Sequence, residues 1–194
     1  MGLNAYLEAV GAVGYTAGTT AAGAWVSIDG KPGKRLAIQS YSLNPRLGGT
    51  ATVGYVQAGL QSANIASAAS GATTITVATF ATAPATGATV VVVLDNGSYQ
   101  WLTVASTAAT TSVPISSALT DDITTGVMYD LGLYSTAGNA QIQPANDVTT
   151  NQSYGSPGLF FGKFKGAPMR VGLINAAASL SATVDYVTYG YINV

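Results

Sequence analysis

Residues 90–104, VVVVLDNGSYQWLTV, decide the fold class of this chain of 194 residues. Two apolar runs, 90–94 and 99–104, flank the polar tetrapeptide Asp95-Asn96-Gly97-Ser98. Asn and Gly both tolerate a positive φ, so an Asn-Gly pair between two apolar runs is a strong signal for a β-hairpin. The stretch therefore predicts two antiparallel strands that are joined by a tight turn.

The two-residue period of β-strands continues on both sides of this hairpin. Further strands are expected around it at 73–80, 111–115 and 127–133, and short strands punctuated by turns at this spacing predict a small β-barrel or sandwich. Towards the two ends of the chain, strands are expected at 35–43, 50–60, 159–164, 169–174 and 181–192. Residues 62–70 are expected to form an Ala/Ser linker, and 44–49 and 135–157 to form loops. The expected fold is all-β.

Residues 1–24 are expected to form an extended N-terminal arm. Leu3, Tyr6, Leu7 and Val10 recur at helical spacing and predict one short helical turn before Gly11. The stretch that follows, GAVGYTAGTTAAGA, is too rich in Gly and Thr to sustain a helix. A disordered terminus is the alternative.

The composition favours a protein that other subunits cover. Apolar residues make up 48% of the chain but charged residues only 8%, and the net charge is −1, whereas a typical soluble domain is about 25% charged. Hydroxyl and methyl groups cost far less to dehydrate than ionised groups. A surface of Thr, Ser, Ala and Gly can therefore be buried by neighbours over much of its area. A neutral, Thr-rich secreted monomer is the alternative.

The few charges are segregated along the chain. Residues 1–60 hold four basic and two acidic side chains (+2), 61–150 hold five Asp and no Lys or Arg (−5), and 151–194 hold three basic side chains and one Asp (+2). We therefore expect 25–60 and 151–194 to form one discontinuous basic β domain, with 61–150 inserted as an acidic β module. Two or three sequential β units are the alternative.

The residue types exclude several kinds of chemistry. The chain has no His and no Cys, so Ser-His-Asp triads, Cys-His nucleophiles and His/Cys zinc sites cannot form. The only adjacent carboxylate pair, Asp121-Asp122, follows Leu119-Thr120 in an expected turn, and neither calcium binding nor glycoside hydrolysis has a supporting motif there. We expect no catalytic residues, no cofactor and no metal site. The longest strongly apolar run, 90–94, is far too short to span a membrane.

Two basic clusters are candidate partner-docking residues. They are Lys31, Lys34 and Arg35 with Arg46, and Lys163 and Lys165 with Arg170. Nucleic-acid binding would call for a larger positive excess, so an acidic protein patch is the expected partner, and solvated loop charges are the alternative. Trp25 and Trp101 could stack on sugars, although Trp101, within an apolar hairpin strand, is expected to pack in a core.

A family resemblance adds to this reading. The central segment, SGATTITVATF (70–80) and GATVVVVLDNGSYQWLTVASTAATTSVPISSALTDDITTG (87–126), resembles β modules of tailed-bacteriophage virion proteins, and the surrounding pattern resembles capsid decoration (cement) proteins. The resemblance implies a non-enzymatic virion protein, assembled in the host cytoplasm, that binds the major capsid protein and itself, often as a homotrimer. It transfers no individual functional residue. A tail or baseplate component and a carbohydrate- or receptor-binding module are the alternatives.

Overall fold

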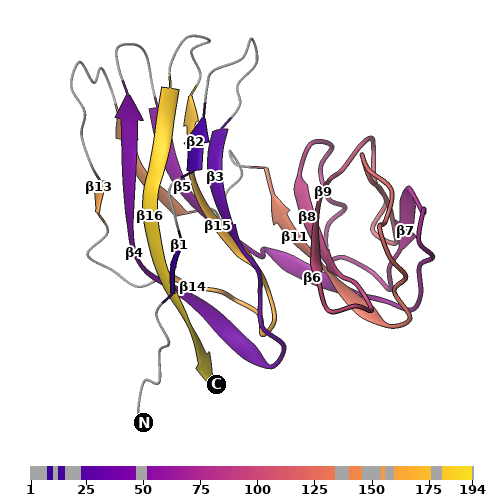
Figure 1. Cartoon of the computed structure of the whole chain (residues 1–194). Coiled ribbons are helices and arrows are strands. Elements are labelled where there is room, and N and C mark those ends of the chain that lie inside the picture. The colour runs from indigo at the N-terminus through magenta and orange to yellow at the C-terminus, as the bar shows by residue number, and fades with distance from the viewer. Residues whose placement is uncertain are drawn as a thin grey trace. The chain divides into compact units, whose positions relative to one another are not determined.

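The computed structural model describes residues 8–10, 13–15, 23–46, 52–133, 140–145, 154–155, 160–175 and 181–193. Strands are the only regular elements among these residues, which confirms the all-β fold class. The chain divides into two compact units, an outer unit (1–58 with 139–194) and an inserted module (59–138), as Figure 1 shows.

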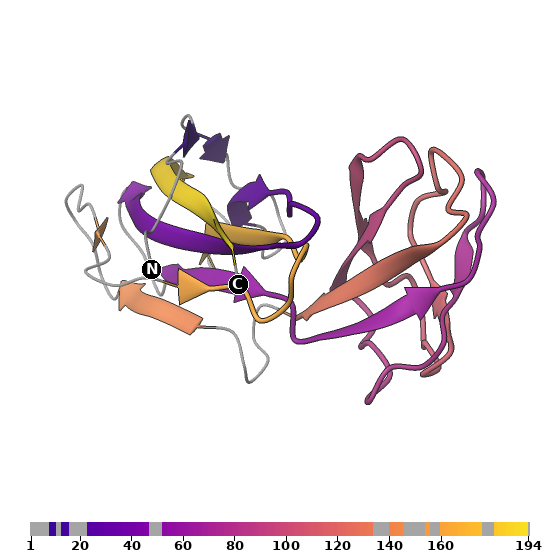
Figure 2. The same cartoon turned by 90° about the horizontal axis from the view of Figure 1, so that it is seen from below.

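The outer unit contains two sheets. Their strands are β1 (Glu8–Val10), β2 (Val13–Tyr15), β3 (Gly23–Ile28), β4 (Lys34–Arg46), β5 (Thr52–Ala58), β12 (Ala140–Ala145), β13 (Tyr154–Gly155), β14 (Phe160–Phe161), β15 (Met169–Asn175) and β16 (Ser181–Asn193). One sheet has the order β1-β16-β4-β13, with β2 on β16 and β14 on β4, and the other has the order β12-β5-β15-β3. Figure 2 shows them as two layers, so the outer unit is a sandwich and its described strands close no barrel.

The core of the outer unit lies between these layers. Val26 and Ile28 of β3 stand opposite Val171 and Met169 of β15, and all four are buried. From the other sheet, Leu36, Ile38 and Val187 are each 0% exposed. Apolar residues at every second position of a strand reach one face of its sheet, so the two-residue period of the sequence builds this core directly.

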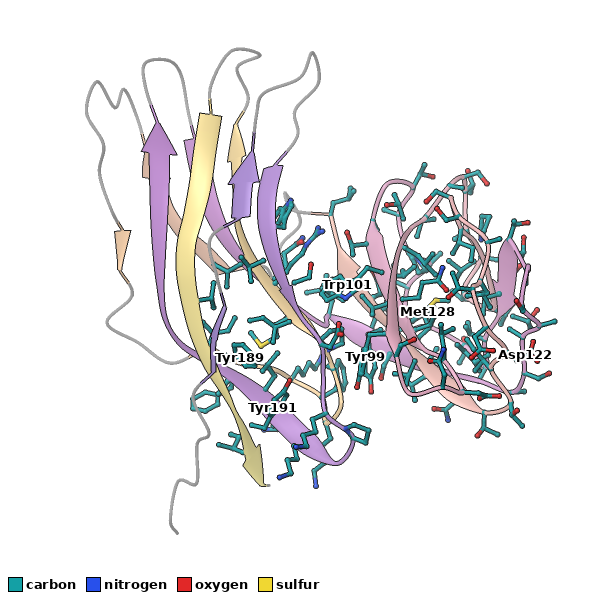
Figure 3. All side chains as sticks on the ribbon, viewed as in Figure 1. Tyr99, Trp101, Asp122, Met128, Tyr189 and Tyr191 are labelled. Carbon is teal, nitrogen blue, oxygen red and sulfur yellow. The ribbon has the colours of Figure 1, made fainter. Side chains whose placement is uncertain are left out.

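The inserted module is made of six short strands. They are β6 (Gln61–Ile65), β7 (Thr74–Thr76), β8 (Thr89–Val93), β9 (Tyr99–Thr103), β10 (Ser112–Pro114) and β11 (Gly126–Gly132). Four of them form a sheet with the order β6-β11-β8-β9, and β7 pairs with β10 in a two-stranded ribbon. Buried side chains from both sheets and from the connecting loops form one hydrophobic cluster, which includes Ile65, Ile75, Phe80, Val92, Leu102, Val113, Ile123 and Met128 (Figure 3).

The predicted hairpin is present. Strands β8 and β9 pair in register from Val93 opposite Tyr99 to Thr89 opposite Thr103. Gly97 in the turn has φ +84°, and its amide donates to the carbonyl of Leu94 over 2.9 Å. A side chain is unfavourable at that φ, which is the reason for the glycine.

Several expected boundaries were wrong. Residues 62–65 of the expected linker belong to β6 and pair with β11, because Ala63 and Ile65 alternate with polar residues and are buried. The inserted module ends at Gly138 rather than at 150, since β12 pairs with β5. β4 extends through the expected loop residues 44–46, and its Pro45 stands opposite Ala182 of β16.

Residues 8–10 and 13–15 of the expected N-terminal arm are strands that pair within their own chain. β1 and β2 both pair with β16, at Glu8 opposite Tyr189 and at Val13 opposite Val184. The predicted helical turn is wrong at residues 8–10, which are strand, while Leu3, Tyr6 and Leu7 lie outside the described residues. Within the described ranges, no helix is long and apolar enough to cross a membrane.

Candidate docking surface

Five of the seven basic residues gather where β4 begins. Lys31, Lys34 and Arg35 lie in the turn before β4 and in its first residues, and Lys163 and Lys165 lie in the loop between β14 and β15. Backbone hydrogen bonds hold the two segments together: the amide of Gly166 donates to the carbonyl of Lys34, and that of Gly162 to the carbonyl of Leu36, both over 2.8 Å. We call these five residues the basic end. Their side chains are half-buried at Lys34 and Arg35 and exposed at the other three positions.

The other two candidate residues lie elsewhere. Arg46 is the last residue of β4, roughly 35 Å along the strand from Arg35 at about 3.3 Å per residue. Arg170 lies on β15 in the second sheet, opposite Gln57 and Ser27. The structure therefore unites most of the two predicted clusters into one surface and separates Arg46 and Arg170 from it.

Aromatic side chains accompany the basic end. The Nζ atom of Lys31 lies 5.7 Å from the ring centroid of Tyr191, and that of Lys163 lies 5.1 Å from the ring centroid of Phe164. The Tyr191 hydroxyl donates to the carbonyl of Asp29 over 2.8 Å. Figure 3 shows Tyr191 beside Tyr189, with side-chain nitrogens gathered next to it. These contacts place the ammonium groups of Lys31 and Lys163 within cation–π distance of aromatic rings while both residues remain exposed.

The part of the sheet next to the basic end is partly apolar. Phe161, Ala37 and Gly190 stand in one row across β14, β4 and β16, and Arg35 stands opposite Ile192 in the same sheet. Phe161 is 50% exposed and is the one large exposed hydrophobic residue in the described part of the chain. The Nε atom of Arg35 is buried and has no hydrogen-bond partner among the described residues. This surface thus combines cations, an exposed ring and an unsatisfied donor.

Arg170 packs against other side chains of the outer unit. Its guanidinium carbon lies 4.0 Å from the ring centroid of Trp25, and its Nε donates to Oε1 of Gln57, which is 0% exposed. Burial lowers the pKa of Arg170 to about 10, because desolvation disfavours the charged form. The stacked guanidinium occupies a face of the Trp25 ring, which is the kind of surface that a sugar would need.

Carboxylates gather in the inserted module at the turns after β8 and before β11. We call Asp95, Asp121 and Asp122 the acidic tip. The amide of Asp95 donates to the carbonyl of Asp122 over 2.9 Å, which ties the two turns together. Asp95 and Asp122 are exposed and Asp121 is half-buried. The sequence predicts a turn at Asp121-Asp122 but does not indicate that Asp95 lies beside it.

Hydrogen bonds from Thr124 stabilise the charged form of Asp95 at the acidic tip. Both carboxylate oxygens of Asp95 accept from the amide of Thr124, over 2.9 Å, and one also accepts from its hydroxyl. These bonds lower the pKa of Asp95 below its ordinary value, because they stabilise the charged form. The amide of Ser70 donates to Asp122 over 2.7 Å. No group of three or more potential metal ligands occurs within the described ranges.

Trp101 does not pack in the core as expected. Its neighbours Leu102 and Val104 belong to the hydrophobic cluster, whereas Trp101 is half-buried on the other face of the sheet, opposite Val91. Tyr129 follows in the same row, opposite Val91 on β11, and burial raises its pKa. The inserted sheet therefore has apolar side chains on both faces, a feature that the continuous run 90–94 signals.

Comparisons with known proteins add little. No protein-family model and no curated protein matches the sequence. A solved structure of infectious bursal disease virus, Gx strain, aligns with 96% of this chain and 41% of its own chain, at 11% identity and a TM-score of 0.21. This chain thus spans less than half the length of that viral chain. At that TM-score the two folds do not correspond, and neither fold nor function is assigned from the alignment.

Proposed function

We propose that this chain is a non-enzymatic structural protein of a virion, and specifically a capsid decoration protein that binds the outer surface of a tailed-phage head and stabilises it. Neighbouring subunits cover much of its uncharged surface, and the basic end orients it on an acidic surface of a neighbour. The proposal joins the resemblance of the central segment to virion β modules with the surface chemistry of the folded chain.

One observation carries the proposal. Between residues 59 and 133, every exposed residue is Thr, Ser, Ala, Gly or Asn, apart from Asp95 and Asp122. Small neutral side chains cost little conformational entropy and little desolvation when another subunit covers them. A protein that must remain dispersed on its own usually carries more charge. A surface of this kind is suited to a closed lattice, where many weak contacts act together.

The experiment is to purify particles that contain the protein and to measure its copy number per particle by mass spectrometry. A decoration protein is expected at hundreds of copies, should bind stripped heads when added back, and should raise their melting temperature. A few copies per particle would instead indicate a tail or baseplate component. Absence from every particle fraction would contradict a virion role altogether.

A further inference from the structure

We infer that the basic end of one copy binds the acidic tip of a second copy of this chain. The inference rests on the docking role proposed above for the basic end, but not on a capsid being present. It names the partner of that surface and predicts a head-to-tail contact between copies.

The basic end requires an acidic partner. It holds five cations (Lys31, Lys34, Arg35, Lys163 and Lys165), with Asp29 as the acidic residue of the adjoining turn. Burying cations against a neutral surface carries a desolvation cost, which is offset only when the partner supplies opposite charges and hydrogen bonds. The exposed ring of Phe161 adds an apolar contact at the same place. The partner must therefore present carboxylates on an otherwise uncharged, close-fitting surface.

The acidic tip meets both requirements. The inserted module contains no Lys or Arg, and three of its four carboxylates, Asp95, Asp121 and Asp122, are in the tip. The fourth, Asp130, is 4% exposed and bonds to Gln61 and to the amide of Gly132. The exposed neighbours of the tip, such as Ser98, Thr120 and Thr125, are small and neutral, so they add little desolvation cost.

The contact between copies is heterologous. The basic end belongs to the outer unit and the acidic tip to the inserted module, so each copy would bind one neighbour through its basic end and another through its acidic tip. Such a heterologous contact repeats into a ring when the rotation between copies closes, and into a filament when it does not. A closed trimer is one such ring.

Charge reversal on the full chain tests the contact. Lys163→Glu with Lys165→Glu reverses part of the basic end, and Asp121→Lys with Asp122→Lys reverses part of the acidic tip. In sedimentation velocity at about 20 mM NaCl, we expect the wild type to associate and each double variant alone to associate at least about tenfold more weakly, because like charges then face each other. An equimolar mixture of the two double variants should associate again, since each reversed surface now meets its complement.

Two further measurements guard against a folding artefact. Asp121→Asn with Asp122→Asn keeps side-chain oxygens that can accept from Ser70 and Asp122, and should also weaken association. Its matched control, Ala85→Lys with Thr86→Lys, raises the net charge by the same amount at exposed positions before β8, and should leave association nearly unchanged. Raising NaCl to about 500 mM shortens the Debye length from roughly 20 Å to about 4 Å and should dissociate the wild type.

Three results would overturn the inference: a wild type that stays monomeric at low salt, association that survives both reversals, or a mixture that fails to recover association. A monomeric wild type that nevertheless binds heads, and loses binding on Lys163→Glu with Lys165→Glu, would overturn self-docking and leave the decoration role intact. Strong self-association with no affinity for any particle would instead contradict the decoration role and leave self-docking intact.

Discussion

The outer unit and the inserted module are both all-β, but they are held together in different ways. In the inserted module, every strand pairs with another strand of the same continuous stretch of chain, from β8 with β9 across a tight turn to β6 with β11 at the two ends of the module, and the core comes from that stretch as well. In the outer unit, the longest pairing joins β4 to β16, from opposite ends of the sequence. An inserted module can thus complete its pairing within one continuous segment, while the host domain depends on segments from both ends of the chain.

The largest expected effect comes from expressing parts of the chain as separate fragments. Residues 59–138 expressed alone should fold, because their core and hydrogen bonds are internal to that stretch. Residues 1–58 alone should not fold, since β4 and β5 then lose β16 and β15. Cooperative thermal unfolding, followed by circular dichroism, distinguishes the two fragments. A folded 1–58 fragment would show that the outer unit is not discontinuous.

Core truncations should then affect each unit separately. Ile75→Ala in the inserted module and Leu36→Ala in the outer unit each remove a side chain that is 0% exposed, and each should lower the free energy of unfolding by about 2–5 kcal/mol. Hydrogen exchange should show faster opening in the mutated unit and little change in the other. The exposed substitution Thr103→Ala serves as the control. Equal acceleration in both units would mean that they unfold as one.

Turn glycines give a smaller and closely matched effect. Gly97 in the inserted module and Gly33 before β4 have φ +84° and +75°, and an added Cβ would meet no atom within 4 Å at either place. Only backbone strain is therefore at issue, and Gly97→Ala and Gly33→Ala should each cost about 1–2 kcal/mol. Urea denaturation measures both. A cost near zero at Gly97 would contradict the tight hairpin geometry.

The smallest effect concerns the acidic tip. Thr124→Val removes the hydroxyl that donates to Asp95, so the pKa of Asp95 should rise towards its ordinary value. A depressed carboxyl pKa stabilises the folded state above the unfolded pKa, and this contribution disappears as the pH falls through the folded pKa. NMR titration of the side-chain carboxyl between about pH 2 and 6 measures the shift. Thr125→Val is the control, and an unchanged pKa in Thr124→Val would rule out the hydroxyl as the cause.

Sequence patterns predicted the elements whose side chains alternate clearly. The hairpin at 90–104 and the strands at 127–133, 169–174 and 181–192 match β8, β9, β11, β15 and β16 closely. The sequence patterns missed β6 and β12, whose apolar positions are Ala or isolated Ile residues among polar ones. Small side chains carry little periodic signal, so the pairing of such strands depends on neighbours that lie far away in the sequence.

In the basic clusters, too, proximity in sequence differs from proximity in the folded chain. Proximity in sequence grouped Arg46 with Lys31, Lys34 and Arg35, but a 13-residue strand carries Arg46 to its far end. Proximity in sequence also joined Arg170 to Lys163 and Lys165, but β15 moves it to another sheet, against Trp25. Conversely, Asp95 and Asp122 come together through a backbone bond between two turns, which no local pattern could indicate.

By itself, the sequence determined the all-β class, the shortage of charge, the exclusion of His and Cys chemistry, and the concentration of acidic residues in the middle of the chain. These follow from residue types and short periodicities, which act locally. The tertiary structure alone decided which charges share a surface, because the pairing of β4 with β14 and β16 brings together residues that lie more than a hundred positions apart. The basic end is a consequence of that pairing, whereas the acidic tip follows from the backbone bond that ties the turn after β8 to the turn before β11.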